Sequence, residues 1–109
     1  MEKTQAAGKS GLAETDRRKV AEVLSQVLAD TYTLYVKTQN FHWNVTGHSF
    51  FGLHKALEDQ YEQLAEASDA IAERIRAVSY PVTATLAGFQ RLARVKEDSP
   101  AEPNEMVKS

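Results

Sequence analysis

The sequence predicts an all-α fold of two long helices and one short helix. The chain has 109 residues, which is enough for one domain at most. Along two stretches, apolar residues recur at steps of three or four, the spacing of one helix face. The first stretch is broken at Gly47, and the second stops before Pro81, because the residue before a proline disfavours helical conformation.

The first long helix is expected over residues 15–45, where the apolar positions run from Val20 to Phe41. Thr15 or Asp16 can cap its beginning, because their side-chain oxygens accept hydrogen bonds from first-turn N–H groups. Residues 1–14 are mostly small or polar and include two glycines. We interpret them as a flexible N-terminal tail.

The second long helix is expected over residues 49–79, with apolar positions from Leu53 to Val78. After the proline, Thr85 to Ala93 can form a short helix. Residues 15–95 are thus a helical hairpin followed by a short crossover helix. The apolar stripe predicted for the short helix consists of Leu86, Phe89 and Leu92.

Residues 96–109 are predicted to be a charged, proline-bearing loop followed by the first turn of a third long helix. Two amphipathic helices packed only on each other leave much of their apolar surface in water, whereas a four-helix bundle closes such a core. The chain therefore either assembles with copies of itself or is part of a longer protein with an incomplete domain here.

Composition narrows the function. The formal net charge is −2, so the chain has no overall basic field that would favour binding to nucleic acid. With no cysteine, a metal has to be bound by His, Asp, Glu or water, which suits iron, manganese or zinc. No apolar run approaches the roughly 20 residues of a membrane span, and the N-terminus lacks a signal-peptide core. We expect a cytoplasmic protein, with association with the nucleoid as an alternative location.

Four candidate metal ligands share one face of the second helix. At about 100° per residue, the other three lie within about 100° of His54, whereas the core positions cluster at about 260–320°. The ligand face therefore lies beside the bundle core and needs a second surface. The candidate ligands are His54, Glu58, Asp69 and Glu73, and the core positions are Leu57, Leu64, Ser68, Ile71 and Ile75.

The ligands form two pairs, each one helical turn apart, and the pairs are separated by fifteen positions, or roughly 22 Å along the axis. One ion cannot contact both pairs, because metal–ligand bonds are only about 2.0–2.6 Å long. Across a two-fold axis, however, the His54/Glu58 end of one copy meets the Asp69/Glu73 end of another. His42, near the end of the first helix, can join the His54/Glu58 pair. The spacing leaves open a plain alternative, in which the acidic residues form a solvated face or a polar interface.

Two motifs resemble the signatures of the Dps family of miniferritins, in the ferritin-like superfamily. The first is His42-Trp43-Asn44-Val45-Thr46-Gly47 with the later Leu53-His54 and Glu58, and the second is Asp69-Ala70-Ile71-Ala72-Glu73-Arg74. The resemblance covers about residues 15–109 and implies a ferritin-like four-helix bundle. This chain supplies the first two long helices of that bundle and the short crossover helix.

The resemblance implies a ferroxidase that oxidises Fe(II), preferentially with hydrogen peroxide, and stores the iron to protect DNA. It places the iron ligands on His42, His54 and Glu58 of one subunit and on Asp69 and Glu73 of its two-fold partner. Trp43 falls where the family has a redox-active aromatic near the di-iron site. The implied assembly is a homo-oligomer of two-fold dimers, a dodecamer in the full-length protein.

Three departures and two rival functions accompany this resemblance. Position 58 is glutamate where many relatives have aspartate, Ser79-Tyr80 replaces a frequent glycine, and the chain stops where the third long helix should begin. One rival is a DNA-binding nucleoid protein that uses weak, non-specific contacts of basic N-terminal residues. The other is a non-catalytic, self-associating helical hairpin.

Overall fold

The computed structural model describes residues 13–47 and 50–96. They contain helix α2 (Glu14–Asn44), helix α3 (Phe50–Ala77) and the short helix α4 (Leu86–Leu92). The all-α prediction and the order of the three helices are confirmed. The proposed third long helix and nearly all of the proposed tail lie outside the described residues, so those two predictions stand as predictions.

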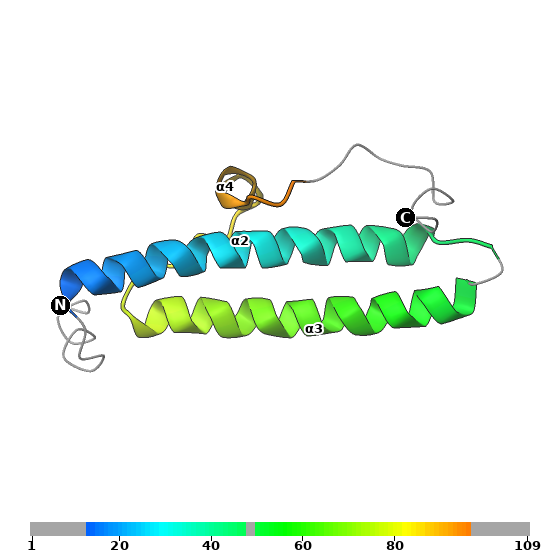
Figure 1. Cartoon of the computed structure of the whole chain (residues 1–109), viewed down its shortest axis with the longest axis horizontal. Coiled ribbons are helices and arrows are strands. Elements are labelled where there is room, and N and C mark those ends of the chain that lie inside the picture. The colour runs from blue at the N-terminus through cyan, green and yellow to red at the C-terminus, as the bar shows by residue number, and fades with distance from the viewer. Residues whose placement is uncertain (1–12, 48–49, 97–109) are drawn as a thin grey trace.

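Helices α2 and α3 run antiparallel along most of their lengths, and α4 lies across α2 (Figure 1). The core sits where all three elements meet, near the middle of α2 and the end of α3. Half-buried side chains of both long helices and of the segment after α3 surround it. The buried residues of this core cluster are Leu28, Ala29, Ile75, Phe89 and Ala93.

One apolar stripe of α2 stays exposed. The first-helix pattern included these positions among its apolar residues, yet in the described chain neither α3 nor α4 covers them. This is the outcome expected when only two long helices pack together. The exposed members are Val20 (37%), Val23 (61%), Val27 (38%) and Leu34 (40%). None of the described helices is long and apolar enough to cross a membrane.

The start of α2 differs from the prediction. The helix begins one residue before Thr15, and its N-cap is Ala13, which makes no side-chain capping hydrogen bond. The capping role predicted for Thr15 or Asp16 is therefore wrong. What fixes this end is tertiary: the Arg17 guanidinium, only 2% exposed, donates from Nη1 to the carbonyl oxygen of Val78 at 3.0 Å.

The same guanidinium joins a network that ties α2 to the segment after α3. Its Nη2 pairs with Oε1 of Glu14, and the Tyr80 hydroxyl donates to Oε2 of that carboxylate at 2.6 Å. The hydrogen bond to Glu14 is the main cause that raises the pKa of Tyr80 above its ordinary value. We call this group, Glu14, Arg17, Val78 and Tyr80, the basal network.

Helix α4 is held by its cap and by α2. Thr85 Oγ1 accepts from the backbone N–H of Gly88 at 3.0 Å, which defines the beginning of the helix. After the helix, Asp30 Oδ1 accepts from the N–H groups of Arg94 and Val95 at 2.6 and 2.9 Å. The predicted apolar stripe is correct for Phe89, which is buried, but Leu86 is 73% exposed and so does not anchor the helix.

The connection after α2 requires a left-handed residue. Val45 leaves the helix in an extended conformation, and Gly47 has φ +97°. This region is open to glycine and unfavourable for residues with a Cβ. The predicted break at Gly47 is confirmed.

The basal network predicts a stability cost for Arg17→Ala. The substitution removes the hydrogen bond to the buried Val78 carbonyl and the packing of a buried side chain, so we expect a loss of about 1–3 kcal/mol in unfolding free energy. Urea denaturation followed by circular dichroism measures it. Arg18→Ala, at an exposed neighbouring position, should stay within about 0.5 kcal/mol of the parent, and equal effects of the two changes would contradict the role of the network.

Two glycines form a matched pair for the turn. A Cβ built at Gly47 or at Gly52 meets nothing within 4 Å, so the two positions differ only in backbone conformation. Gly47→Ala should destabilise by about 1–2 kcal/mol, because its φ is positive. Gly52→Ala, inside α3, should stabilise by about 0.5–1 kcal/mol. Thermal unfolding of both variants tests the opposite signs, and two shifts of the same sign would refute the assignment.

Candidate metal centre

The site is built on two histidines from different helices. His42 lies in the last turn of α2 and is 5% exposed, and His54 lies in the first turns of α3 and is half-buried. Their rings stack with centroids 3.6 Å apart and planes inclined by 21°. The structure thus brings together two of the predicted ligands that are twelve positions apart in the sequence.

A reciprocal pair of hydrogen bonds sets the orientation of both rings. His42 Nδ1 lies 2.7 Å from the carbonyl oxygen of His54, and His54 Nδ1 lies 3.0 Å from the carbonyl oxygen of His42. A carbonyl can only accept, so each Nδ1 carries the proton. In the neutral ring the lone pair is then on Nε2, the arrangement found when a backbone oxygen orients a metal-binding histidine.

Tyr61 of α3 closes one side of the pair. Its ring meets the edge of His42 at a centroid distance of 5.2 Å and an angle of 75°. Burial is the main cause that raises the pKa of the Tyr61 phenol, and the carboxylates of Glu58 and Glu62 raise it further. The phenol therefore stays protonated at neutral pH, beside a locally acidic stretch of α3.

The other residues predicted near this end are less enclosed. Glu58 is half-buried one turn after His54 on α3. Trp43 follows His42 in the sequence but is 68% exposed. Its predicted place near a di-iron site and its redox role stay predictions.

The second predicted pair, Asp69 and Glu73, is exposed on α3, one turn apart and much farther along the same helix. Fifteen positions separate His54 from Asp69, which corresponds to roughly 22 Å on a continuous helix. Because α3 is unbroken between them, the two pairs cannot converge within one chain.

Within residues 13–47 and 50–96, no group of three or more His, Asp or Glu side chains is placed to hold a metal ion. A single described chain therefore offers oriented imidazoles at one end and exposed carboxylates at the other. The chemistry of this donor set, imidazole plus carboxylate without thiolate, suits iron, manganese or zinc. A second copy in antiparallel orientation is what would bring the two halves together.

The sequence reasoning did not identify the contact of Tyr61 with His42 or the hydrogen bonds between each histidine ring and the other's backbone carbonyl. Tyr61 follows His54 by seven positions, which returns to within about 20° of the same helix face, so the spacing held a signal for it. The sequence held no signal for the reciprocal hydrogen bonds, because they depend on how the last turn of α2 meets the first turns of α3.

The family model that matches the chain is the ferritin-like domain, over residues 21–109. Among curated relatives, a DNA protection during starvation protein of Helicobacter pylori is 43% identical over 81 residues, covering 74% of this chain and 56% of its own length. A second protein with that name, from Brevibacillus brevis, is 41% identical and covers 83% of this chain and 61% of its own length. The chain spans about half the length of the curated relatives it matches.

Solved structures agree with the match to the ferritin-like domain. The crystal structure of a Dps protein from Vibrio cholerae, described as a member of a superfamily of ferritin-like diiron-carboxylate proteins, has a TM-score of 0.80 at 33% identity. The match covers 84% of this chain and 57% of the Vibrio chain. The predicted ferritin-like fold is confirmed by this likeness together with the family model.

The ring orientation gives a direct spectroscopic prediction. When neutral, the rings of His42 and His54 should both carry their proton on Nδ1, because each Nδ1 faces a backbone carbonyl. Nitrogen-15 NMR of the histidine side chains, with His54→Asn as the assignment control, measures which nitrogen carries the proton. A protonated Nε2 beside a bare Nδ1 in either ring would contradict the arrangement.

Proposed function

The chain belongs to the Dps family of the ferritin-like superfamily, and on this premise we propose that it oxidises and sequesters Fe(II) at sites shared between two copies of the chain. The ligands would be His42, His54 and Glu58 of one copy and Asp69 and Glu73 of the other. The observation that carries the proposal is the stacked pair of histidines, in which two backbone carbonyls leave Nε2 of each ring as the acceptor nitrogen.

The geometry of α3 supports a shared site. Its two candidate pairs lie on neighbouring parts of one face but far apart along the axis, and the described residues of one chain form no three-ligand group. A two-fold interface is self-complementary, so one antiparallel dimer would create two equivalent sites. The exposure of Asp69 and Glu73 in the single chain agrees with this role, because they have to meet a partner.

The donor set also fits the chemistry. Anionic carboxylates stabilise Fe(III) more than Fe(II), because the extra positive charge gains more from negative ligands, so the site would favour oxidation. With hydrogen peroxide as oxidant, two Fe(II) ions each give up one electron. The peroxide takes both electrons and two protons and becomes two molecules of water. Delivering the two electrons together avoids releasing a hydroxyl radical.

Two relatives carry the name DNA protection during starvation protein. We propose the same protective role for this chain, through the removal of Fe(II) and peroxide that would otherwise react near DNA. Trp43, exposed beside His42, would take up stray oxidising equivalents. The assembly would be built from two-fold dimers, twelve chains forming the shell in the full-length protein, with cytoplasmic location.

A subunit-mixing experiment tests the shared site. His54→Ala removes one half of the site and Glu73→Ala removes the other, so each variant alone should oxidise Fe(II) with peroxide at least roughly tenfold more slowly. In a randomly co-assembled mixture half of the dimers are mixed, and each of these has one intact site out of two. We therefore expect recovery to about one quarter of the parental rate. The rate is followed by the absorbance of the Fe(III) product.

Glu22→Ala, at an exposed carboxylate of α2, is the matched control and should keep the parental rate. Loss of activity in both single variants without recovery on mixing, although the subunits co-assemble, would overturn the shared site. Parental rates in both variants would overturn this assignment of the ligands. A parental rate no faster than that of buffer would overturn the ferroxidase proposal and favour the self-associating hairpin.

A further inference from the structure

Six aromatic rings form an unbroken row through the hairpin, beginning at the candidate metal centre. From His54 the row passes to His42 and then to Tyr61, with ring centroids 3.6 and 5.2 Å apart. It continues through three more contacts, Tyr61 to Tyr35 at 5.9 Å, Tyr35 to Tyr32 at 5.4 Å and Tyr32 to Phe89 at 4.7 Å. Every step is within the range of direct ring contact.

Both long helices contribute rings to this row. Tyr32, Tyr35 and His42 are on α2, and Tyr61 of α3 fills the gap between Tyr35 and His42. Three of the four tyrosines in the sequence belong to it. Ten positions separate Tyr32 from His42, so the row extends about 15 Å along α2.

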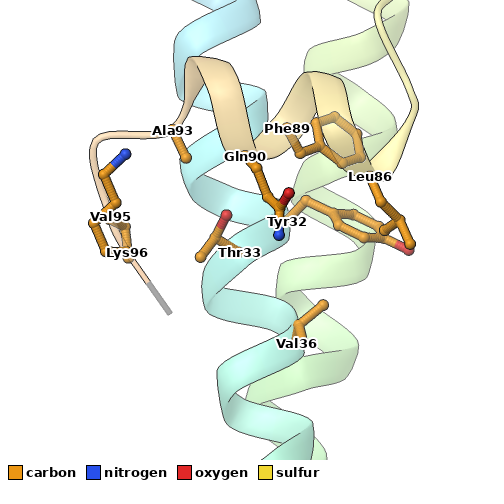
Figure 2. Close-up of a pocket in the computed structure, with 9 residues that line it drawn as sticks. All are labelled: Tyr32, Thr33, Val36, Leu86, Phe89, Gln90, Ala93, Val95 and Lys96. Atoms are coloured by element: carbon orange, nitrogen blue, oxygen red, sulfur yellow. The ribbon is translucent and has the colours of Figure 1, made fainter. Parts of the chain in front are cut away.

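The far end of the row opens to the surface. Tyr32 and Phe89 form part of the wall of a hollow of about 530 Å³ between α2 and α4. Figure 2 shows the two rings beside Leu86, with Thr33 and Gln90 nearby. A small soluble molecule or ion can therefore reach Tyr32, whereas the near end of the row lies at the histidines.

We propose that Tyr61, Tyr35 and Tyr32 form a relay that carries single oxidising equivalents away from the metal centre to the hollow beside α4. This inference rests on the proposed iron oxidation for the source of those equivalents. Electron transfer falls off steeply with the distance between rings, so rings in contact exchange electrons readily. Phenylalanine is far harder to oxidise than tyrosine, so the relay ends at Tyr32.

The relay would act when only one Fe(II) is available to the peroxide. The peroxide then takes one electron and one proton and yields one water and one hydroxyl radical. The radical takes an electron and a proton from the Tyr61 phenol and becomes water, leaving a tyrosyl radical. Each following tyrosine reduces its predecessor, releasing its proton to water while the predecessor regains one. At Tyr32 the last radical is reduced by a soluble one-electron donor, for which Fe(II) itself suffices, with uptake of a proton.

Apolar packing alone would not require hydroxyls in this row. Leucine or phenylalanine would fill the same interface without the cost of placing a polar group among apolar side chains. The three tyrosines are half-buried, and the Tyr35 oxygen accepts a hydrogen bond from Gln39 Nε2 at 3.1 Å. The shared property of the three rings is therefore a phenol that can be oxidised, in addition to their bulk.

An iron-free experiment tests the relay by itself. The chain has no cysteine, so Lys55→Cys, at an exposed position next to His54, gives a unique thiol for attaching a ruthenium photo-oxidant. After a flash in the presence of a nitroso spin trap, peptide mass spectrometry should find the trapped radical at Tyr32. Tyr61→Phe in this background should abolish the Tyr32 adduct, and Tyr61→Trp, which restores an oxidisable ring, should recover it.

Tyr80→Phe, which changes the one tyrosine outside the row, is the matched control and should keep the adduct. A Tyr32 adduct that survives Tyr61→Phe, or that is absent from the Lys55→Cys parent, would overturn the relay. Because phenylalanine preserves the ring, circular dichroism of Tyr61→Phe should match that of the parent. Loss of the adduct with recovery by tryptophan is a result that a purely structural role cannot give.

A second arm supplies Fe(II) and peroxide without the photo-oxidant. The same Tyr32 adduct is expected, and Tyr61→Phe should move covalent oxidation to the peptides that contain His42 and Trp43. If iron is not oxidised although the flash produces the Tyr32 adduct, the relay stands and the proposed iron oxidation fails. If iron is oxidised but the adduct is indifferent to Tyr61→Phe, the relay is refuted and the iron oxidation stands.

Discussion

The constraint on which this structure depends is the rigidity of one continuous helix. Helix α3 fixes the pair His54 and Glu58 at one end of a face and the pair Asp69 and Glu73 much farther along it. A helix does not shorten, so the two pairs stay apart by a distance several times the length of any metal–ligand bond. One chain can therefore present both halves of the proposed site but cannot bring them together. In the proposed function, association in two-fold symmetry is then a requirement of the chemistry, and the hairpin would serve to hold each half of the shared site in position.

The hairpin is fixed at both ends by polar interactions, with the apolar core between them. At the end that holds the candidate site, the two histidines exchange hydrogen bonds with each other's backbone. At the opposite end, the basal network ties Arg17 to Val78 and, through Glu14, to Tyr80. Buried polar groups are tolerated when they are hydrogen-bonded, and both sets lie where the two helices would otherwise splay. The orientation of the imidazoles is thus part of the folding of the hairpin.

Periodicity and breakers in the sequence were sufficient to predict the helices and the face that carries the candidate ligands. The break at Gly47 and the short helix after Pro81 were predicted correctly, because each depends on neighbours in the sequence. The cap of α2 and the exposure of Leu86 were not predicted correctly, because they depend on a buried arginine and on the placement of α4 on α2. The meeting of His42 with His54 was foreseen from their places near the turn, whereas the tautomers required the carbonyl positions. The assignment of the ligands themselves remains a prediction.

The exchanged hydrogen bonds of the two histidines have a consequence for how the sequence can change length. A residue inserted inside α3 between Ile75 and His54 would rotate the His54 ring by about 100° around the axis and separate it from the His42 carbonyl. The same insertion in the connection that begins at Val45 leaves both helices in register, because loops accept added residues at small entropic cost. Natural length variation should therefore concentrate in the connection, while the number of residues from the core to each histidine is held constant. In an alignment of such length variants, gaps should fall in the connection and not between the core and either histidine.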